Sequence, residues 1–200
     1  ENRSWLDDAR LLEALGEAFG EAFMFEEAVN YYDQAIASGK STASIKAIEQ
    51  SANFHIRLAV QEYENDPQKY VASKEKIREQ IEKLKQLMVT IDKTTERLSM
   101  VGSGYKRLAR ISSGRTPKEC DSALKNMRIY YDYAWKKNEQ DVYPLTNVLI
   151  AKIVQVLRAG HPAKNQLSEI ELLKDEAKKL AAKGQMNAPD DFWAATGVID

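Results

Sequence analysis

The chain has 200 residues, of which 44% are hydrophobic and 30% are charged. This is enough apolar material for a core, and the composition is not that of a disordered or low-complexity protein. The longest uncharged run, 142–151, is half of the roughly 20 residues that a membrane span needs, so we expect no transmembrane helix. A lone cysteine, Cys120, favours the cytoplasm. The absence of an initiator Met and of a leader predicts a fragment of a longer protein.

Charge is distributed unevenly along the chain, although the net charge is only −1. Residues 1–33 carry nine acidic side chains and two arginines, a net charge of −7. Residues 97–137 carry ten lysines or arginines and three acidic side chains, a net charge of +7. Two such regions give a folded molecule a strong internal dipole, and one interpretation is that they attract each other across the fold.

The hydrophobic periodicity is helical nearly everywhere, without the alternation of strands or hairpin turns. The expected helices, in chain order, span 4–22, 25–38, 42–65, 67–93, 95–111, a segment from 117, a segment from 144, and 167–183. A short aromatic turn with Phe192 and Trp193 follows. The expected fold is therefore all-α.

Several boundaries have recognisable signals. Ser41 or Thr42 is the expected N-cap of the third helix, and Thr116-Pro117 with Glu119 is expected to open the sixth. Pro144 is expected to open a seventh helix with apolar residues all around its axis, which predicts a central, buried helix. The heptad pattern over 67–93 favours a long antiparallel hairpin over 42–93, and a dimeric coiled coil is the alternative.

An internal repeat narrows the fold. The motif Tyr-Tyr-Asp-x-Ala occurs at 31–35 and again at 130–134, each time after a helix with a glycine at its expected crossing point. This spacing is typical of tetratricopeptide repeats, and the second copy carries a 13-residue insertion. We expect a tetratricopeptide-like, right-handed solenoid of eight or nine helices in a single domain, 1–200. Its expected parts are a first repeat (9–40), the hairpin (42–93), a second repeat (95–137) and C-terminal helices (143–200).

Three motifs carry a narrower resemblance. The segments 47–59 (AIEQSANFHIRLA) and 95–109 (TERLSMVGSGYKRLA), the turn 143–147 (YPLTN) and the closing 191–193 (DFW) are similar to signatures of the tetratricopeptide sensor family. That family is related to the TRAF-binding central region of apoptosis-signal-regulating kinases. The resemblance implies a regulatory module of bacterial conflict systems, joined to an effector, that senses a possible nucleotide-derived signal or docks a partner.

No catalytic or metal site is expected. His55, His161 and Cys120 are too far apart to form a ligand cluster, and His55 is interpreted as a packing residue. The segment Gly102-Ser103-Gly104 lies within a helix, so we interpret it as close helix packing rather than a phosphate loop. We expect a non-enzymatic chain without a cofactor, a nucleic acid ligand or a membrane partner.

The candidate ligand site is the polar face of the fifth helix, together with a polar strip on the third. Glu49, Asn53 and Arg57 form that strip by their spacing of four, and it serves either a structural network or a ligand. When the two repeats are aligned on Gly16 and Gly102, these polar faces are expected to line the concave groove of the solenoid. The expected groove is acidic near Glu13, Glu17 and Glu21 and basic near 106–107. The candidate ligand residues are Asn53, Arg57, Glu96, Arg97, Ser103, Lys106, Arg107, Tyr143 and Asn147.

Arginine forks suit phosphate and carboxylate groups, so the first hypothesis is a sensor of a small anionic or nucleotide-derived ligand that relays the signal to an effector. The alternative is a scaffold that docks a partner peptide or domain. A spacer or oligomerisation element built on 42–93 is a third hypothesis, and the oligomeric state stays open.

Overall fold

The computed structural model describes residues 8–38 and 43–187. Within these ranges the chain forms eight α-helices, a short 3-10 helix and no strand, so the prediction of an all-α fold is confirmed. The chain divides into two compact units, Glu1–Ile91 and Asp92–Asp200. The division falls two residues before the end of the expected hairpin, 42–93, and ahead of the expected second repeat, 95–137.

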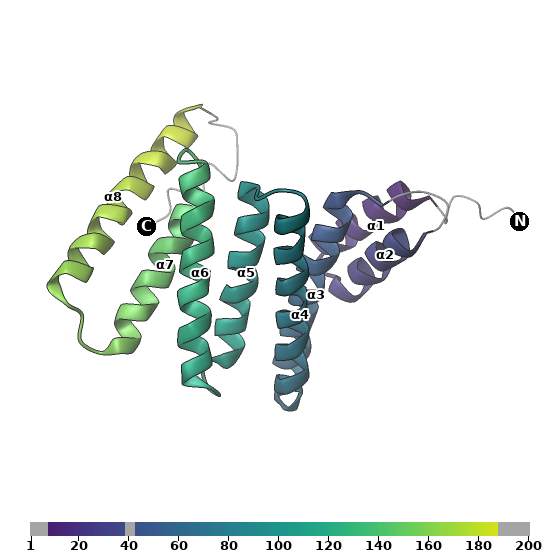
Figure 1. Ribbon diagram of the computed structural model, residues 1–200, viewed down its shortest axis with the longest axis horizontal. Helices are drawn as coiled ribbons and strands as arrows, with labels where there is room; N and C mark the ends of the chain where they lie inside the picture. Colours follow the sequence, from purple (N-terminus) through teal and green to yellow (C-terminus); the bar gives the residue numbers. More distant parts are fainter. Residues whose placement is uncertain (1–7, 39–42, 188–200) are drawn as a thin grey trace, which may run out of the picture. The chain divides into compact units, whose positions relative to one another are not determined.

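The first unit contains two pairs of helices (Figure 1). The first pair is α1 (Ala9–Glu21) and α2 (Phe25–Ala37), and the second is α3 (Ile45–Asn65) and α4 (Tyr70–Thr90), joined by the 3-10 helix η2 (Pro67–Lys69). Neighbouring helices pack in chain order. The core between α2 and α3 contains Ala28, Val29, Tyr32, Ala47 and Phe54.

Glycine permits the close approach of α1 to α2. A Cβ on Gly16 would lie 2.7 Å from Cδ2 of Tyr32, which is too close for any side chain. One turn later, a Cβ on Gly20 would lie 2.1 Å from Cζ of Phe54 on α3. The tyrosine and phenylalanine rings stack on each other with centroids 5.8 Å apart. The two glycines therefore make room for the aromatic core of this unit.

The helices α3 and α4 form the expected hairpin, but the first begins later and the second ends earlier than predicted. The N-cap of α3 is Ser44, whose Oγ accepts from the N–H of Ala47, so the prediction that the helix begins at Thr42 is wrong. Three neighbouring hydroxyl residues offered equivalent caps in sequence. On α4, Ile77, Ile81 and Leu84 are buried as the heptad predicted. The helix ends at Thr90, before the expected Lys93.

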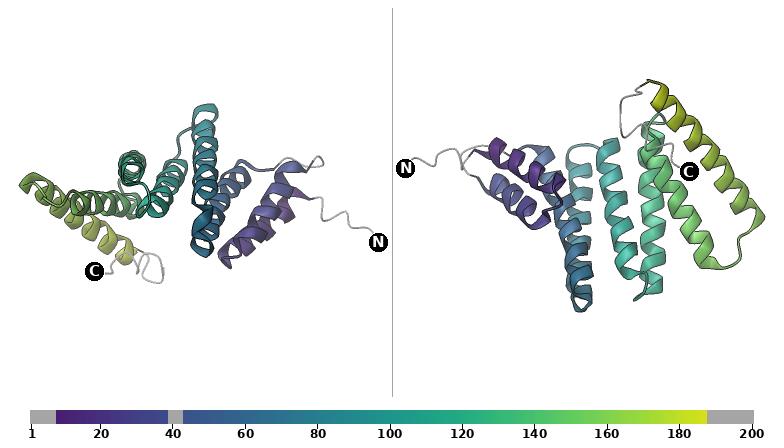
Figure 2. Two further views of the ribbon diagram at one scale, coloured as in Figure 1. Left: turned by 90° about the horizontal axis from the view of Figure 1, so that it is seen from below. Right: turned by 180° about the vertical axis from the view of Figure 1, so that it is seen from behind.

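The second unit contains α5 (Thr95–Ser112), α6 (Pro117–Lys137), α7 (Val142–Ala159) and α8 (Lys164–Asn187). Each helix packs antiparallel to the next, so α5, α6 and α7 lie side by side and α8 returns along α7 (Figures 1 and 2). At the start of α6, Pro117 takes the expected position, but the Thr116 side chain makes no capping hydrogen bond. The core includes Val101, Leu108, Met127, Tyr131, Leu145 and Val148, all nearly inaccessible to solvent.

The crossing of α5 and α6 has the same geometry as that of α1 and α2. A Cβ on Gly102 would lie 2.8 Å from Cδ2 of Tyr131, just as Gly16 meets Tyr32. Gly16 lies five residues before the end of α1, whereas Gly102 lies ten before the end of α5. Tyr32 is seven residues into α2, and Tyr131 is fourteen into α6. The additional residues of the second repeat thus lengthen α5 after Gly102 and α6 before Tyr131, on the side of the crossing where the two helices are connected.

The helix α7 differs from its prediction. It begins at Val142, two residues before Pro144, because Asp141 is the N-cap and its carboxylate accepts from the N–H of Tyr143. The prediction of a fully buried helix is wrong, since it buries one face only. A stripe on the other face is exposed: Tyr143, Ile150, Ile153 and Leu157. Gly160, with a φ of 76°, ends the helix.

By length and composition, α7 is also the one helix among the described residues that could cross a membrane. The sequence-based exclusion considered only its uncharged part, whereas the whole helix includes Lys152 and Arg158. Both cations form ion pairs with neighbouring helices, Lys152 with Glu169 on α8 and Arg158 with Asp121 on α6. A helix that packs in a protein core passes the same test.

The last helix, α8, is longer than the expected 167–183. Near its end, Nζ of Lys183 donates to Oε1 of Gln140 at 2.7 Å, which brings this end of α8 to the loop between α6 and α7. The expected aromatic turn at Phe192 and Trp193 lies outside the described residues.

Candidate functional site

The polar face of α5 carries three of the predicted residues in two turns: Ser103, Lys106 and Arg107. The helix presents them on one side because residues three and four apart share a face. Val101 and Leu108 on its other side are buried in the core of the second unit. The polar residues are therefore held by a well-packed helix.

A first chain of hydrogen bonds runs from Arg107 to α7. The Arg107 guanidinium donates to the hydroxyl of Ser103 and, at 3.3 Å, to its carbonyl oxygen. The Ser103 hydroxyl also lies close enough to Tyr131 on α6 to favour the ionised form of its phenol. The Tyr131 and Tyr143 hydroxyl oxygens are 3.2 Å apart. Three helices are thus joined by one polar chain at the glycine crossing.

A second chain of hydrogen bonds starts at Lys106 and also reaches Tyr143. Nζ of Lys106 donates to Oδ1 of Asn147 at 3.0 Å. The amide nitrogen of Asn147 then donates to the carbonyl oxygen of Tyr143 at 2.9 Å. Asn147 is only 3% exposed, so the lysine ammonium is fixed by a buried amide. Five of the nine predicted residues are therefore brought together.

The electrostatics of this surface favour an anion. Burial of its ammonium lowers the pKa of Lys106, and the neighbouring charge of Arg107 lowers it further. The lysine side chain is nevertheless exposed along much of its length. Its hydrogen-bond acceptor, Asn147, is neutral. An anion that binds here would offset both the repulsion and the desolvation of the ammonium.

Tyr131, the residue at the centre of the first chain, has its pKa raised, chiefly by burial and also by Tyr143. It therefore stays protonated and acts as a hydrogen-bond relay rather than as a charge. Tyr143 is 51% exposed and lies edge-on to Tyr131, with ring centroids 5.9 Å apart. The surface presents one exposed aromatic ring, the exposed Lys106 and the partly buried Arg107.

Glu96 and Arg97 lie at the start of α5, six or more residues before Ser103, which is about 9 Å along a helix. Arg97 is buried and binds the carboxylate and the carbonyl oxygen of Asp92. Its contacts are those of a structural residue. Glu96 is exposed in the first turn, where an acidic side chain stabilises the helix.

Asn53 and Arg57 belong to the first unit. The amide of Asn53 donates to Oε1 of Gln50 at 3.2 Å. The Arg57 guanidinium lies over the rings of Phe25 and Phe54, at 5.7 and 5.5 Å from their centroids. Its Nε is buried, and no hydrogen-bond partner for it occurs among the described residues. Their convergence with the residues of α5 stays a prediction.

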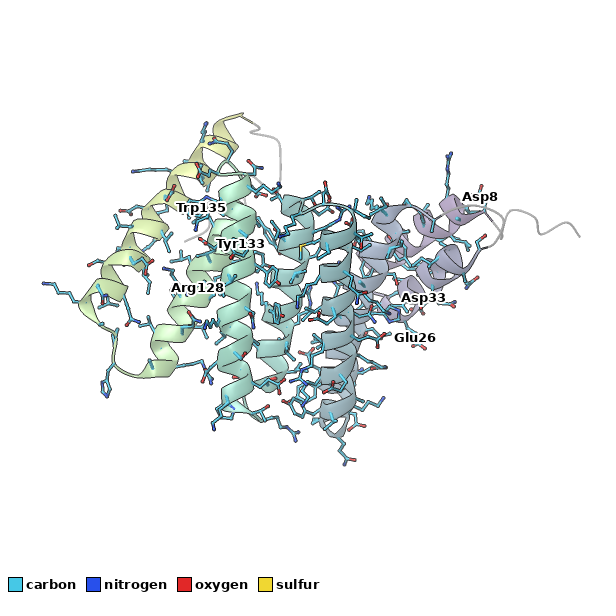
Figure 3. The ribbon with its side chains drawn as sticks, viewed as in Figure 1. Asp8, Glu26, Asp33, Arg128, Tyr133 and Trp135 are labelled. Carbon is cyan, nitrogen blue, oxygen red and sulfur yellow. The ribbon has the colours of Figure 1, made fainter. Side chains whose placement is uncertain are left out.

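The acidic face of α1 has structural contacts. The Glu13 carboxylate accepts from the N–H and the hydroxyl of Ser44, both at 2.7 Å, and Glu17 pairs with Lys46 at 3.1 Å. Two of the three glutamates therefore hold the start of α3. His55, interpreted as a packing residue, also contacts the Asp33 carboxylate at 3.0 Å, and Asp33 is labelled in Figure 3.

No group of three metal-binding side chains occurs in the part of the chain that the structure describes. Cys120 is buried, and desolvation raises the pKa of its thiol, which makes it a poor nucleophile. The residue that the sequence analysis missed is Tyr131. It was noted there only as part of the repeat, although its position opposite Gly102 was the available signal.

The comparisons with known proteins agree with this architecture. No curated protein matches the chain. The model of the family described as "Tetratricopeptide Repeats-Sensor" (TPR-S) matches residues 24–152, which include α2 to α6 and more than half of α7. This is more than half of the chain and includes both hydrogen-bond chains. The chain therefore belongs to the TPR-S family of tetratricopeptide sensor domains.

Proposed function

We propose that the chain is a non-catalytic sensor that binds a small anionic signal on the surface of α5 and α7. The observation that carries the proposal is the pair Lys106–Arg107. These two adjacent cations project from a rigid helix, and the first is held by the buried Asn147 and has a lowered pKa. A surface that holds two cations side by side on one helix face suits an anionic ligand.

The chemistry of the surface favours a phosphate-bearing ligand that also carries a ring. Arginine offers two parallel donors to one anionic group, and lysine adds a compact charge. The half-exposed ring of Tyr143 provides a face against which a base or sugar could pack. A nucleotide-derived molecule combines both features, which is why we favour this class.

The hydrogen-bond chains also supply a route for the signal. Ligand contact with Arg107 competes with its bond to Ser103, which is linked through Tyr131 to Tyr143. Binding would therefore change the contacts among α5, α6 and α7. In the proposal, this change is passed to an effector joined to the chain in a cytoplasmic bacterial conflict system.

Isothermal titration calorimetry against a panel of nucleotides and NAD-derived molecules tests the proposal. We expect at least one to bind, and Lys106→Ala to weaken its binding about tenfold or more through the loss of one charged hydrogen bond. Lys136→Ala removes an exposed lysine of α6 that pairs with Asp132, and should leave binding unchanged. No heat from any ligand with folded protein would overturn the proposal.

One observation favours the alternative of a docking scaffold. The exposed stripe of α7 contains Ile153 and Leu157, at 36% and 72% exposure, and would suit a partner helix. Affinity capture from the source cell should then recover a stoichiometric partner, and Leu157→Asp should release it. Recovery of no partner would leave the sensor as the better proposal.

A further inference from the structure

A pocket in the second unit lies away from the surface described above. It is formed where α6, α7 and α8 meet and has a cavity volume of about 70 Å³. Polar side chains make up most of its lining: Arg128, Lys152, Gln155, Gln166 and Glu169. Val156 and Ile170 add an apolar part. Because α8 lies beyond the residues 24–152 that match the family, the family does not account for this pocket.

The arginine of the pocket has an unmet hydrogen-bonding need. Nε of Arg128 is buried and has no hydrogen-bond partner among the described residues. Two turns along the same face of α6, Nε1 of Trp135 is in the same condition (Figure 3). Buried donors are nearly always satisfied in folded proteins, so a buried arginine nitrogen at a pocket indicates a missing acceptor.

The other polar groups define the charge of that acceptor. Lys152 is 12% exposed and pairs with Glu169, so these two charges compensate each other. Arg128 then contributes the one uncompensated charge of the lining. The side-chain oxygen of Gln166 accepts from the N–H of Ala163 at 2.9 Å, which leaves its amide nitrogen as a donor. The pocket therefore offers one positive charge and neutral donors.

From this arrangement we infer that the pocket binds a small monocarboxylic acid. The carboxylate would accept from Arg128 and Gln166, and the apolar body of the acid would lie against Val156 and Ile170. A doubly charged phosphate suits the pocket less well, because Arg128 supplies a single uncompensated positive charge and would leave the second negative charge of the phosphate without a partner. The inference involves neither Lys106 nor Arg107, so it does not depend on the proposed sensor surface.

Solution NMR of the whole chain tests this inference, with benzoate as the probe and its neutral isostere benzamide as the control. The resonances to follow are the Nε–H of Arg128 and the side-chain amide of Gln166. We expect benzoate to shift both in a saturable manner and benzamide to shift neither. Equal shifts with both compounds, or none with benzoate, would overturn the inference.

Variants identify the groups responsible. Arg128→Gln should weaken benzoate binding about tenfold or more, whereas Lys125→Gln, which removes an exposed lysine on the same helix, should not. If Arg128→Gln does not fold, Arg128→Lys keeps the charge without the planar fork and should still weaken binding. Unchanged affinity in the folded arginine variant would contradict the assignment.

Two further variants separate the sources of an effect. Glu169→Gln removes the carboxylate that compensates Lys152, so the pocket gains a second uncompensated positive charge and should bind inorganic phosphate, which it should not do in the wild type. Persistent exclusion of phosphate from Glu169→Gln would show that Glu169 does not set the charge preference. Arg107→Ala should leave benzoate binding intact, so failure of the proposed sensor surface would not be mistaken for failure of this pocket.

Discussion

The two glycine crossings of the molecule share one geometry and have opposite electrostatic surroundings. In the first unit Gly16 meets Tyr32, and in the second Gly102 meets Tyr131, at almost the same distances. Glu13, the most constrained acidic neighbour of Tyr32, is bonded to the start of α3. Around Tyr131, in contrast, Lys106 and Arg107 lie beside the half-exposed Tyr143. The same packing unit thus serves stability in one repeat and leaves a cationic surface in the other.

The largest expected effect tests the shared geometry. Gly102→Ala and Gly16→Ala each place a Cβ within 3 Å of a buried tyrosine ring, so each should destabilise its unit by about 1–3 kcal/mol. Gly184→Ala is the matched control, because nothing lies within 4 Å of its Cβ. It should stabilise α8 by up to about 1 kcal/mol through helix propensity alone. Urea unfolding measures all three, and a neutral Gly102→Ala would contradict the common crossing.

The next effect separates the two tyrosines. Tyr131→Phe removes a hydroxyl that bonds to Tyr143, so it should destabilise the second unit by about 0.5–1.5 kcal/mol. Tyr32→Phe removes a hydroxyl for which no such link between helices occurs among residues 8–38 and 43–187, so it should be nearly neutral at pH 7. Thermal unfolding of both variants decides the matter. Equal losses would mean that the polar chain of the second unit adds nothing to its stability.

Alkaline pH gives a further difference. Burial, followed by the charges of Glu17, Glu13 and Glu21, raises the pKa of Tyr32 to about 12. A folded pKa above the unfolded value of about 10 means that the native state holds its proton more tightly. The corresponding stability is present below about pH 10 and is lost as the pH rises toward 12. The free energy of unfolding should therefore fall less between about pH 10 and 12 in Tyr32→Phe than in the wild type. Identical pH dependence in the two proteins would contradict this prediction.

The sequence predicted the helices and the repeat well because both depend on local periodicity. The positions of Gly16 and Gly102 were sufficient to predict the close crossings. Prediction failed where a choice among neighbours was needed, as with the cap at Ser44. It also failed for α7, whose apolar residues surround the axis although only one face is covered, because periodicity does not reveal how many neighbours a helix has.

The candidate site was predictable to the same extent. Ser103 and Arg107 are one turn apart, so their contact follows from the helix alone. The bond from Lys106 to Asn147 joins residues 41 positions apart and depends on how α6 packs against both α5 and α7. The available signal was a lone asparagine within an apolar run. Arg128 gave a similar signal between Met127 and Ile129, but only the fold brings α8 opposite it.

The most direct test of the central claim, that the cationic surface of the second crossing binds an anion, is a paired measurement on Arg107→Ala. Its melting temperature and its affinity for the ligand found by calorimetry should be measured beside Lys136→Ala. The account predicts a stability loss of at most about 1 kcal/mol, because the hydrogen bonds of Arg107 to Ser103 lie within its own helix, and an affinity loss of about ten- to a hundredfold. A variant that melts normally and binds the ligand as wild type does would contradict it.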